Sequence, residues 1–377
     1  MTRNEAVARP APARESKAAG ASDRAPPHPF PPVMEPLTSV RFLLALGVVL
    51  FHYQLMWTLP PEAAGLLNRA RLGVDVFFIL SGFILSHVYV RAWAEGRFPY
   101  SSFLWARLAR LYPVHLLTLG ATIMLWGLGR WAGARFEAAA FDPAAIPQHL
   151  LLVHAWWATP TVQWNFPSWS ISAEWFAYLT FPAFALASLT LRRRPIVAVV
   201  LAATLFFSLD AIVQAYGGSL TRLTAHGGVL RIIPSFAMGV ALHRLGSTRA
   251  PPTLVAHTGM GVAVVWIVVA ATLGLADRWT WLGLAALIYC TAETAKAGRG
   301  GVLAGAADGL SGRGLLRRLH DPPTGRHRLF RAARSLRAAG RRLGVGGLGR
   351  CPGLLHVRLR CGLSWRGASR ARLATPP

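Results

Sequence analysis

The sequence is dominated by long apolar segments that are separated by short, basic connections. A helix needs roughly 20 predominantly apolar residues to cross the hydrocarbon core of a bilayer. The chain has 377 residues, of which 53% are hydrophobic, and its mean hydropathy is +0.39. These features predict an all-α fold, a polytopic transmembrane helix bundle with about 8–9 membrane helices. The predicted helices cover residues 40–58, 73–91, 111–128, 171–190, 195–216, 228–244, 253–274 and 279–294.

A shorter apolar run, "AAIPQHLLLVHAWW" at 144–157, is doubtful as a full span. Arginine and lysine cluster beside the other apolar segments, and such clusters prefer the cytoplasmic side of a membrane. If 144–157 does not cross, every cluster falls on that side, whereas a crossing would place Arg192–Arg194 outside. We therefore expect a re-entrant or interfacial segment here. The protein is predicted to be a multi-pass protein of the plasma or inner membrane with a cytoplasmic N-terminus.

The two ends of the chain differ from its apolar body. Residues 1–33 are rich in Ala, Pro and Arg and lack the apolar core of a signal peptide, so they are predicted to be a disordered, basic cytoplasmic tail. Residues 34–300 are predicted to form the membrane domain, and 301–377 are an Arg- and Gly-rich tail. From Ala306 onward sixteen arginines and two aspartates contribute +14 of the formal +25. Most of the net positive charge therefore lies outside the predicted membrane domain, and it does not indicate a nucleic-acid partner.

An Arg-rich tail without lysine is typical of GC-rich coding sequence read out of frame. When Asp308 to Phe330 are shifted forward by one nucleotide, with free choice of synonymous codons, they can read M-V-F-L-G-E-V-S-Y-A-V-Y-M-T-H-L-P-V-D-I-V-F. That string has the character of a membrane-helix start. We therefore expect a frame-shifted C-terminus from about residue 306, and the alternative is a native basic tail that is disordered or bound to anionic lipid.

Two ionisable residues interrupt the first apolar segment, "SVRFLLALGVVLFHYQLMW" at 39–57. Arg41 and His52 are eleven residues apart, which on a helix is three turns plus about 20°, so both lie on one face with about 16 Å between them along the axis. An unpaired ionisable group at the bilayer centre costs at least about 2.5 kcal/mol and normally faces a protein interior or a wet cavity. The alternatives are a positive-inside anchor for Arg41 and a structural, hydrogen-bonded role for His52.

Further ionisable residues lie at the ends of the next two segments. Asp75 is a few residues inside "RLGVDVFFILSGFILSHVYV" and would reach the depth of His52 if the first two segments formed an antiparallel hairpin. It could then hold one imidazole nitrogen, although a helix-capping role is the alternative. Arg107 and Arg110 are one turn apart and could clamp a phosphate or pyrophosphate, while positive-inside topology explains them equally well.

The stretch "NFPSWSISAEWFAYLTFP" at 165–182 places an acidic residue inside an apolar helix. Ser170 and Glu174 are four residues apart and share a helix face, next to Trp169 and other tryptophans. The tryptophans alone would be an ordinary interfacial belt, but a carboxylate in this setting needs a functional partner. Arg231, at the start of "RIIPSFAMGVALHRL", is predicted to pair with Glu174 or Asp75.

Taken together, these motifs resemble the acyltransferase-3 family of integral membrane O-acyltransferases, over residues 34–300. The family typically has about ten transmembrane helices, uses acyl-CoA from the cytoplasm, and modifies bacterial sugars and related metabolites. Its last helix typically begins with L-G-x-x-S-Y-x-x-Y-x-x-H, which the shifted frame offers. The matching motifs are Arg-x10-His at Arg41 and His52, "GVDVFFILSGFILS" at 73–86, Arg-x-x-Arg at Arg107 and Arg110, "PSWSISAEWFAYLTFP" at 167–182 and "RIIPSFAMGVAL" at 231–242.

The resemblance implies a membrane-embedded enzyme that moves an acyl group, by default acetyl, from acyl-CoA to a hydroxyl of a carbohydrate or metabolite. The intramembrane histidine of the family, here His52, would be a general base or, through an acyl-imidazole, a nucleophile. Its partners would be the lipid bilayer, acyl-CoA and a sugar-like acceptor, without nucleic acid. Asp75 is expected to orient His52, and Glu174 is expected to be a further catalytic residue. The phosphates of CoA would be bound by Arg41, Arg107 and Arg110. The acceptor would be contacted by Trp169, Ser170 and Arg231.

No metal or permanently bound cofactor is expected, because Cys290, Cys351 and Cys361 have no metal-ligand or redox spacing. Two alternatives to an active acyltransferase stay open. Intramembrane charges could move a proton or a lipid-linked sugar through a transporter. The altered C-terminus could also leave an inactive remnant of the enzyme.

Overall fold

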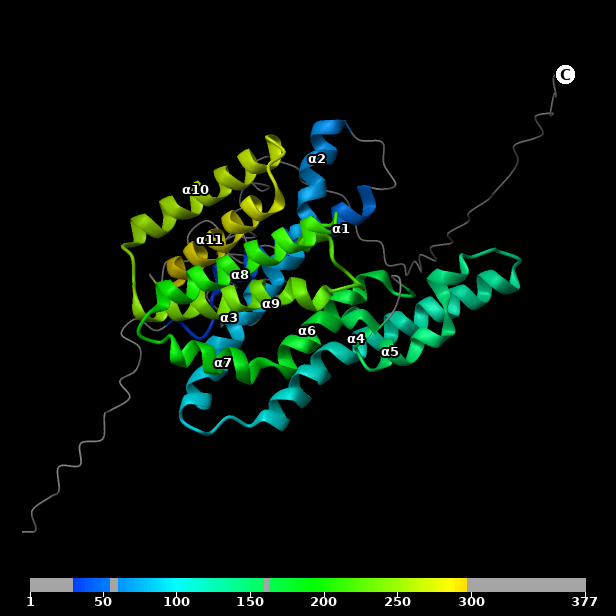
Figure 1. Cartoon of the computed structure of the whole chain (residues 1–377), viewed down its shortest axis with the longest axis horizontal. Coiled ribbons are helices and arrows are strands. Elements are labelled where there is room, and N and C mark those ends of the chain that lie inside the picture. The colour runs from blue at the N-terminus through cyan, green and yellow to red at the C-terminus, as the bar shows by residue number, and fades with distance from the viewer. Residues whose placement is uncertain (1–29, 55–59, 159–162, 297–377) are drawn as a thin grey trace, which may run out of the picture. The chain divides into compact units, whose positions relative to one another are not determined.

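A computed structural model describes residues 30–54, 60–158 and 163–296. Its regular elements in these ranges are helices, which confirms the predicted all-α fold (Figure 1). The predicted tails 1–33 and 301–377, with the expected frame shift, lie outside the described residues except for 30–33. Six helices among the described residues are long and apolar enough to cross a membrane: α1 (Glu35–Tyr53), the continuous stretch Ala64–Ala94, α4 (Tyr100–Trp131), α8 (Pro195–Ala215), α9 (Gly228–Thr248) and α10 (Thr253–Thr272).

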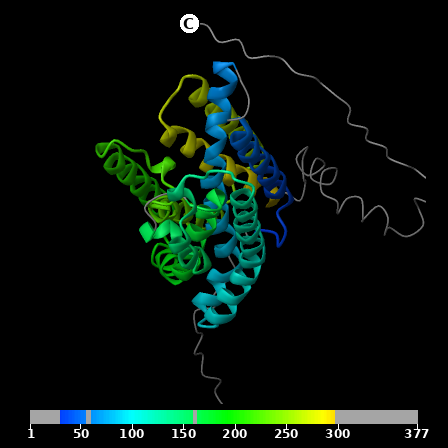
Figure 2. The ribbon, with the colours of Figure 1, turned by 90° about the vertical axis from the view of Figure 1, so that its right-hand side faces the viewer.

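The second of these helices starts earlier than the predicted segment 73–91. It joins α2 (Pro61–Arg69), the one-turn η2 (Ala70–Leu72) and α3 (Gly73–Ala94). α1 runs alongside this helix and packs against it mainly at η2 and α3 (Figure 2). The next helix, α4, has 32 residues and is thus about 48 Å long, which exceeds the roughly 30 Å of a hydrocarbon core.

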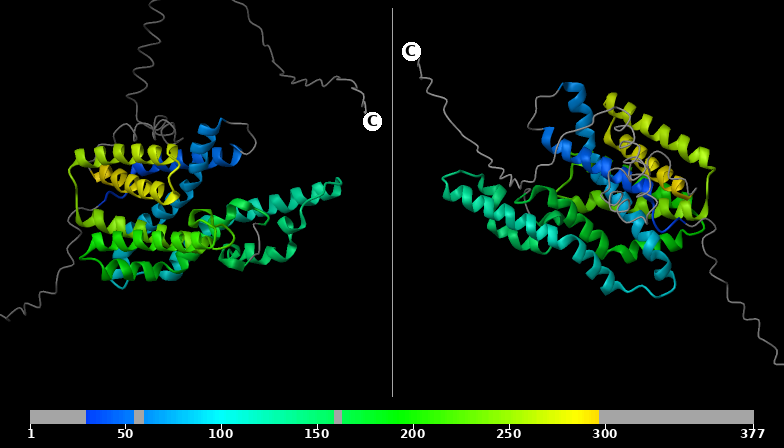
Figure 3. Two further views of the ribbon diagram at one scale, coloured as in Figure 1. Left: turned by 45° about the horizontal axis from the view of Figure 1, so that its top comes forward. Right: turned by 180° about the vertical axis from the view of Figure 1, so that it is seen from behind.

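The predicted single helix at 171–190 is wrong, because two helices occupy this segment. α6 covers Trp169–Leu179 and α7 covers Phe181–Thr190. Pro182 lies in the first turn of α7, where a missing N–H is tolerated, but its ring cannot continue the preceding helix. The last predicted segment forms α11 (Asp277–Lys296), which packs along α10 (Figure 3) and has charged residues at both ends. Those charges lower its hydropathy below that of the six helices.

The doubtful segment 144–157 contains no spanning helix. α5 covers only Ile146–Leu150, about 7.5 Å, and a π-turn follows at His154–Ala158. Three non-glycine residues near it have positive φ angles, namely Leu152 at 58°, Trp157 at 63° and Trp164 at 51°. Such strained backbone concentrates at functional sites. The remaining short turns are η3 (Ala138–Phe141), η4 (Pro143–Ala145), η6 (Phe166–Ser168) and η7 (Leu220–Arg222).

α3 and α9 form the central pair of helices. Both contribute to two hydrophobic clusters, one shared with α1, α8 and α11 and the other with α4, α6 and α7. In an 18-residue apolar window of Ala64–Ala94 and of Gly228–Thr248, 61% and 67% of the window is buried, whereas the share is 22% or less in the other four helices. Those four present their apolar side chains outward, as expected of helices that face lipid.

Glycines allow α3 and α9 to approach closely. A Cβ atom on Gly82 would lie 2.1 Å from the carbonyl oxygen of Phe236, and one on Gly239 would lie 1.9 Å from that of Ile79. Neither position could hold a larger residue without moving a backbone. Small residues commonly permit this kind of close packing between membrane helices.

Candidate active site

A cavity of about 340 Å³ lies among α1, α3, α4 and α6. Its walls come from segments that are far apart in the sequence, so the cavity exists only once the helices have packed. Apolar side chains of α1 and α3 form much of its surface, and charged groups enter from three helices. Five of the nine predicted site residues line it: Arg41, Arg107, Arg110, Ser170 and Glu174.

The predicted stripe on α1 forms one wall of this cavity. Arg41, Ala45 and Val48 line it with helical spacing, and His52 is the next residue on the same face, one turn beyond Val48. The half-buried His52 ring also contacts Phe166 edge to face, with 6.0 Å between ring centroids. His52 therefore stands at the end of the cavity wall, against the turn that precedes α6.

The orientation of His52 is set by its own helix rather than by Asp75. Its Nδ1 lies 2.8 Å from the carbonyl oxygen of Val48. Because a carbonyl oxygen can only accept a hydrogen bond, Nδ1 carries the proton in the neutral ring, and Nε2 presents its lone pair. In this tautomer Nε2 is the nitrogen that can act as a general base.

Glu174 has partners that the sequence did not indicate. Its Oε1 accepts hydrogen bonds from the Ser81 hydroxyl at 3.0 Å and from the Tyr178 hydroxyl at 2.5 Å. Both residues also line the cavity. Tyr178 is four residues after Glu174 on the same helix face, a spacing that could have revealed it, and Ser81 interrupts an apolar run. The predicted pairing of Glu174 with Arg231 does not occur.

The cavity carries excess positive charge. Three arginines and one glutamate line it, and Ser170 lies on the same wall as Glu174 and donates to the Pro167 carbonyl at 3.0 Å. Within the described residues the buried Nε of Arg107 has no hydrogen-bond partner. Buried donors are almost always paired, so this group fits an anionic ligand in the cavity.

Arg231 pairs with Asp75, the other partner predicted for it, in a buried ion pair. Arg231 Nε donates to Oδ1 at 2.9 Å and Nη2 to Oδ2 at 2.7 Å, and the two side chains are 0% and 3% exposed. The Trp169 ring lies over the guanidinium, 4.8 Å from its central carbon. Both carboxylate oxygens of Asp75 bond to Arg231, and Nδ1 of His52 bonds to Val48. The contact that the sequence led us to expect between Asp75 and His52 is therefore not formed. None of these three residues lines the cavity, so the predicted acceptor role of Trp169 and Arg231 lacks a place there.

Three buried histidines form a stack that the sequence did not indicate. His149 and His154 stack face to face at 3.9 Å, and His115 of α4 lies 6.0 Å from His154 with an interplanar angle of 6°. Ser168, just before α6, is 3.1 Å from Nε2 of His154. The rings are stacked rather than aimed at one point, and no group of three His, Cys, Asp or Glu residues in the described ranges is placed to hold a metal ion.

We expect this stack to make the fold sensitive to acid. Burial, with the positive charge of a neighbouring histidine, lowers the pKa of His149 to about 4 and that of His154 to about 3. An unfolded histidine titrates near pH 6.5 and takes up its proton first. The contribution of His149 and His154 to the free energy of unfolding should therefore be constant above about pH 6.5 and fall progressively as the pH drops toward these folded-state values.

Thermal unfolding of the detergent-solubilised chain across this range measures the effect. His149→Phe retains a stacked ring but removes one titrating group, so its melting temperature should fall less steeply on acidification. At about pH 8 the variant and the wild type should unfold at similar temperatures. Equal slopes in the two proteins would contradict the prediction.

Comparison with known proteins gives matches over the helical part of the chain. A family model described as an acyltransferase domain (Acyl_transf_3) matches residues 37–297. The chain is 36% identical to acyltransferase MdmB of Streptomyces mycarofaciens over 155 residues, and this aligned region covers 39% of this chain and 38% of that protein. It is 39% identical to protein 2 in the picA locus of Rhizobium radiobacter over 83 residues, and this aligned region covers 22% of this chain and 40% of that protein. The matches thus span about two fifths of these relatives, and no solved structure matches.

Proposed function

The chain belongs to the Acyl_transf_3 family of membrane acyltransferases, and on that basis we propose that it transfers an acyl group, by default acetyl, from acyl-CoA to a hydroxyl of a carbohydrate or related metabolite. The observation that carries the proposal is the positively charged cavity whose α1 wall leads toward His52. Arg41, Arg107 and Arg110 line the cavity, and His52, which does not line it, lies one turn beyond the lining residue Val48 with its Nδ1 bonded to the Val48 carbonyl. This is the arrangement that a donor with phosphates and a distant thioester requires.

In this proposal the arginines of the cavity hold the donor. Guanidinium groups match phosphate oxygens in geometry and charge, and Arg107 offers a donor that is unpaired within the described structure. The pantetheine arm would then extend along the stripe of α1. Arg41 and His52 are separated by about 16 Å along the helix axis, which suits an extended arm. The thioester would reach the end of the cavity beside His52.

His52 would act as the general base. Its Nε2 takes the proton of the acceptor hydroxyl while the hydroxyl oxygen attacks the thioester carbonyl carbon. The carbon–sulfur bond then breaks, an ester forms, and the CoA thiolate leaves and takes up a proton. In the alternative route Nε2 itself attacks and forms an acyl-imidazole, which the acceptor hydroxyl then cleaves. Labelled acyl groups would remain on protein without acceptor only in the second route.

Glu174 would position the donor. Ser81 and Tyr178 both bond to Oε1, and within the described residues no hydrogen bond engages Oε2. A carboxylate oxygen accepts hydrogen bonds, and the pantetheine arm carries amide N–H groups that can donate them. Glu174 is thus a positioning residue in this proposal, beside the path of the arm.

The same arrangement supports an orientation in the membrane. The chain is a multi-pass membrane protein, and Arg41, Arg107 and Arg110 line one cavity with its positive end away from His52. Basic residues favour the cytoplasmic side, where acyl-CoA is made available. We therefore place the N-terminus and the donor entrance in the cytoplasm, with the protein in the plasma or inner membrane.

We expect Arg110→Gln to weaken binding of coenzyme A by about 10-fold, because one charge-assisted contact to a phosphate is lost. Pantetheine, which lacks the phosphates, should bind the wild type and the variant equally. Calorimetric titration of the purified full chain measures both. Arg130→Gln is the matched control, because Arg130 belongs to the same helix but packs over Trp126 outside the cavity. Equal losses in the two variants would refute the assignment.

The activity itself is tested by comparing this chain with a version whose reading frame is shifted from about residue 306. Labelled acetyl-CoA is supplied to membranes that contain either protein, and alkali-labile acetyl esters are counted. Ester formation by at least one version is expected. Activity of the shifted version alone would identify this chain as an inactive remnant, and absence of ester formation in both would contradict the proposed function.

A further inference from the structure

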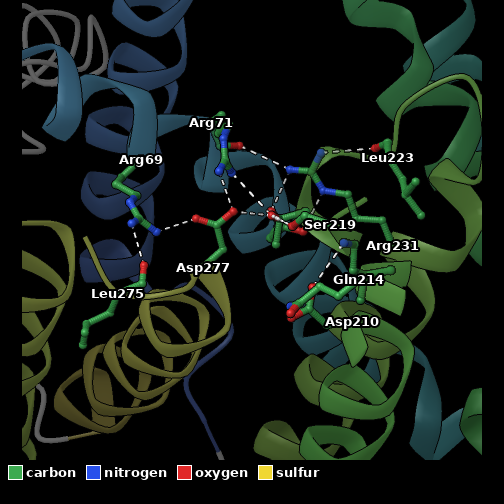
Figure 4. A network of polar contacts seen from close by, with 12 residues as sticks. Arg69, Arg71, Asp210, Gln214, Ser219, Leu223, Arg231, Leu275 and Asp277 are labelled. Atoms are coloured by element: carbon green, nitrogen blue, oxygen red, sulfur yellow. Dashed lines mark hydrogen bonds and ion pairs between the residues drawn. The ribbon is translucent and has the colours of Figure 1, made fainter. Parts of the chain in front are cut away.

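A second cleft, of about 580 Å³, lies outside the candidate active site. Three separate parts of the chain line it: α2 with η2, the end of α8 with the loop through η7, and the segment that joins α10 to α11. The cleft and the active-site cavity share no lining residue. Its polar side chains were not among the predicted site residues, and Figure 4 shows part of their network.

An ionic cluster builds one wall of this cleft. Asp277 accepts hydrogen bonds from Arg69 and Arg71, each at 2.5 Å, and from the Thr221 hydroxyl at 2.5 Å (Figure 4). Arg69 also donates to the Leu275 carbonyl at 2.5 Å. One carboxylate thus serves two guanidiniums, which fixes the wall and leaves one positive charge uncompensated.

The opposite wall adds a further unmatched charge. Asp210 is shared between Arg278 at 3.3 Å, Gln214 at 2.5 Å and the backbone N–H of Leu220 at 3.2 Å. Arg222 lines the cleft, is exposed, and has no carboxylate within ion-pair distance among the described residues. Three arginines and two aspartates line the cleft, an excess of one positive charge, and Arg278, which pairs with Asp210 but does not line the cleft, adds one more.

Neutral hydrogen-bonding groups accompany this charge. Asn68, Gln214 and Ser219 line the cleft and supply amide and hydroxyl groups that can bond to sugar hydroxyls. Guanidinium groups recognise carboxylate and phosphate through paired, directional hydrogen bonds. The combination fits a ligand that is both anionic and rich in hydroxyl groups.

The cleft is attached to the His52 end of α1. Gln54, two residues after His52, is buried and donates to the Asn68 side chain at 2.9 Å. Arg231 joins the cleft to the central helices, because it donates to the carbonyls of Arg71 and Leu223 as well as to Asp75. A ligand held here would approach His52 from the end of the helix that is opposite to Arg41.

We propose that this cleft binds the carboxylate or phosphate group of an acidic sugar acceptor. The inference rests on the proposed acyl transfer, since it names the class of acceptor for that reaction. Anchoring a charged group away from the reacting hydroxyl contributes binding energy that positions the hydroxyl near His52. Arg69 and Arg71 form the fixed wall, and Arg222 is the residue that meets the ligand.

Binding of small acidic sugars to the purified full chain tests this proposal without any acyl transfer. Glucuronic acid and glucose 6-phosphate are titrated calorimetrically, with glucose as the neutral comparison. We expect the charged sugars to bind at least about 10-fold more tightly than glucose, and Arg222→Gln to remove that advantage. Arg135→Gln is the matched control, because Arg135 is exposed in the loop after α4 and lines neither cavity.

Each other outcome overturns the proposal. Equal binding of charged and neutral sugars by the wild type would show that the cleft does not select charge, and equal losses in Arg222→Gln and Arg135→Gln would show a nonspecific effect. Nanodiscs with phosphatidylglycerol or phosphatidylcholine complete the test. If anionic lipid binds in an Arg222-dependent way and the sugars do not, the cleft is a lipid headgroup site.

The test separates this inference from the proposed function. Arg222→Gln should leave coenzyme A binding unchanged, because Arg222 does not line the donor cavity. If the wild type bound charged sugars but not coenzyme A, the proposed donor site would be contradicted and the assignment of the cleft would stand. Failure of charged-sugar binding alone would overturn only the assignment of the cleft.

Discussion

Replacing His52 with alanine is expected to lower kcat for acyl transfer by about 10²- to 10⁴-fold, the usual contribution of a general base. The Nδ1 bond to Val48 holds the ring in the tautomer whose Nε2 can accept the hydroxyl proton, and alanine removes that acceptor. The side chain is half-buried at the end of the cavity wall, so the helices should still pack. The amount of folded, membrane-inserted protein should therefore stay the same while transfer of labelled acetyl to the acceptor is lost.

His257→Ala is the matched control for this experiment. His257 lies in α10, and its Nδ1 bonds to the Thr253 carbonyl at 2.9 Å, the same local arrangement as His52 and Val48. It is half-buried, like His52, and lines neither cavity. The control should retain full activity. Activity retained in His52→Ala, or lost equally in His257→Ala, would remove His52 from the mechanism.

Breaking the ion pair between Asp75 and Arg231 is expected to have the largest effect on stability. Arg231→Met leaves a fully buried carboxylate without its bidentate partner, and such single removals cost about 3–5 kcal/mol. The double variant Asp75→Leu with Arg231→Met removes both charges and should recover most of the lost stability. Thermal unfolding in detergent, followed by intrinsic fluorescence, measures the series.

Arg91→Met provides the comparison with a solvent-exposed pair. Arg91 bonds to Glu95 at 2.8 Å, but its side chain is 70% exposed, so its removal should cost about 0–1 kcal/mol. If Arg231→Met and the double variant were equally destabilised, packing of the arginine rather than the uncompensated charge would account for the loss. If Arg231→Met behaved like Arg91→Met, the buried pair would have no structural role.

The membrane helices could be predicted from the sequence because hydropathy over about 20 residues is a local property. The same hydropathy signal wrongly predicted a single helix at 171–190, where one apolar run contains the two helices α6 and α7. Pro182 was the available signal, since it cannot continue a helix from the preceding turn. The apolar run at 144–157 has spanning composition over part of its length, yet strained turns at Leu152 and Trp157 break it.

The candidate site divides in the same way between local and long-range information. The alignment of Arg41, Val48 and His52 follows from helical periodicity within one element, so the sequence could predict it. Partners on different helices could not be chosen by sequence. Asp75 was a candidate partner for both His52 and Arg231, and the packing of α3 against α9 places it against Arg231.

The polar cleft beyond η2 was not predicted, because its walls come from three distant segments. In the sequence Arg69 and Arg71 precede the predicted segment 73–91, and Asp277 precedes the predicted segment 279–294, positions where charged residues usually contact water or lipid headgroups. Only the packing of α2 beside the start of α11 shows that they form one cluster. The same holds for Ser81, whose contact with Glu174 depends on the approach of α3 and α6.

An experimental structure of the complex with coenzyme A would show whether the donor lies along α1. We expect density for the phosphates within hydrogen-bond distance of Arg41, Arg107 and Arg110, with the pantetheine arm along α1 and its sulfur atom beside Nε2 of His52. Coenzyme A bound in the cleft at Arg222, or bound with its thiol end away from His52, would contradict it.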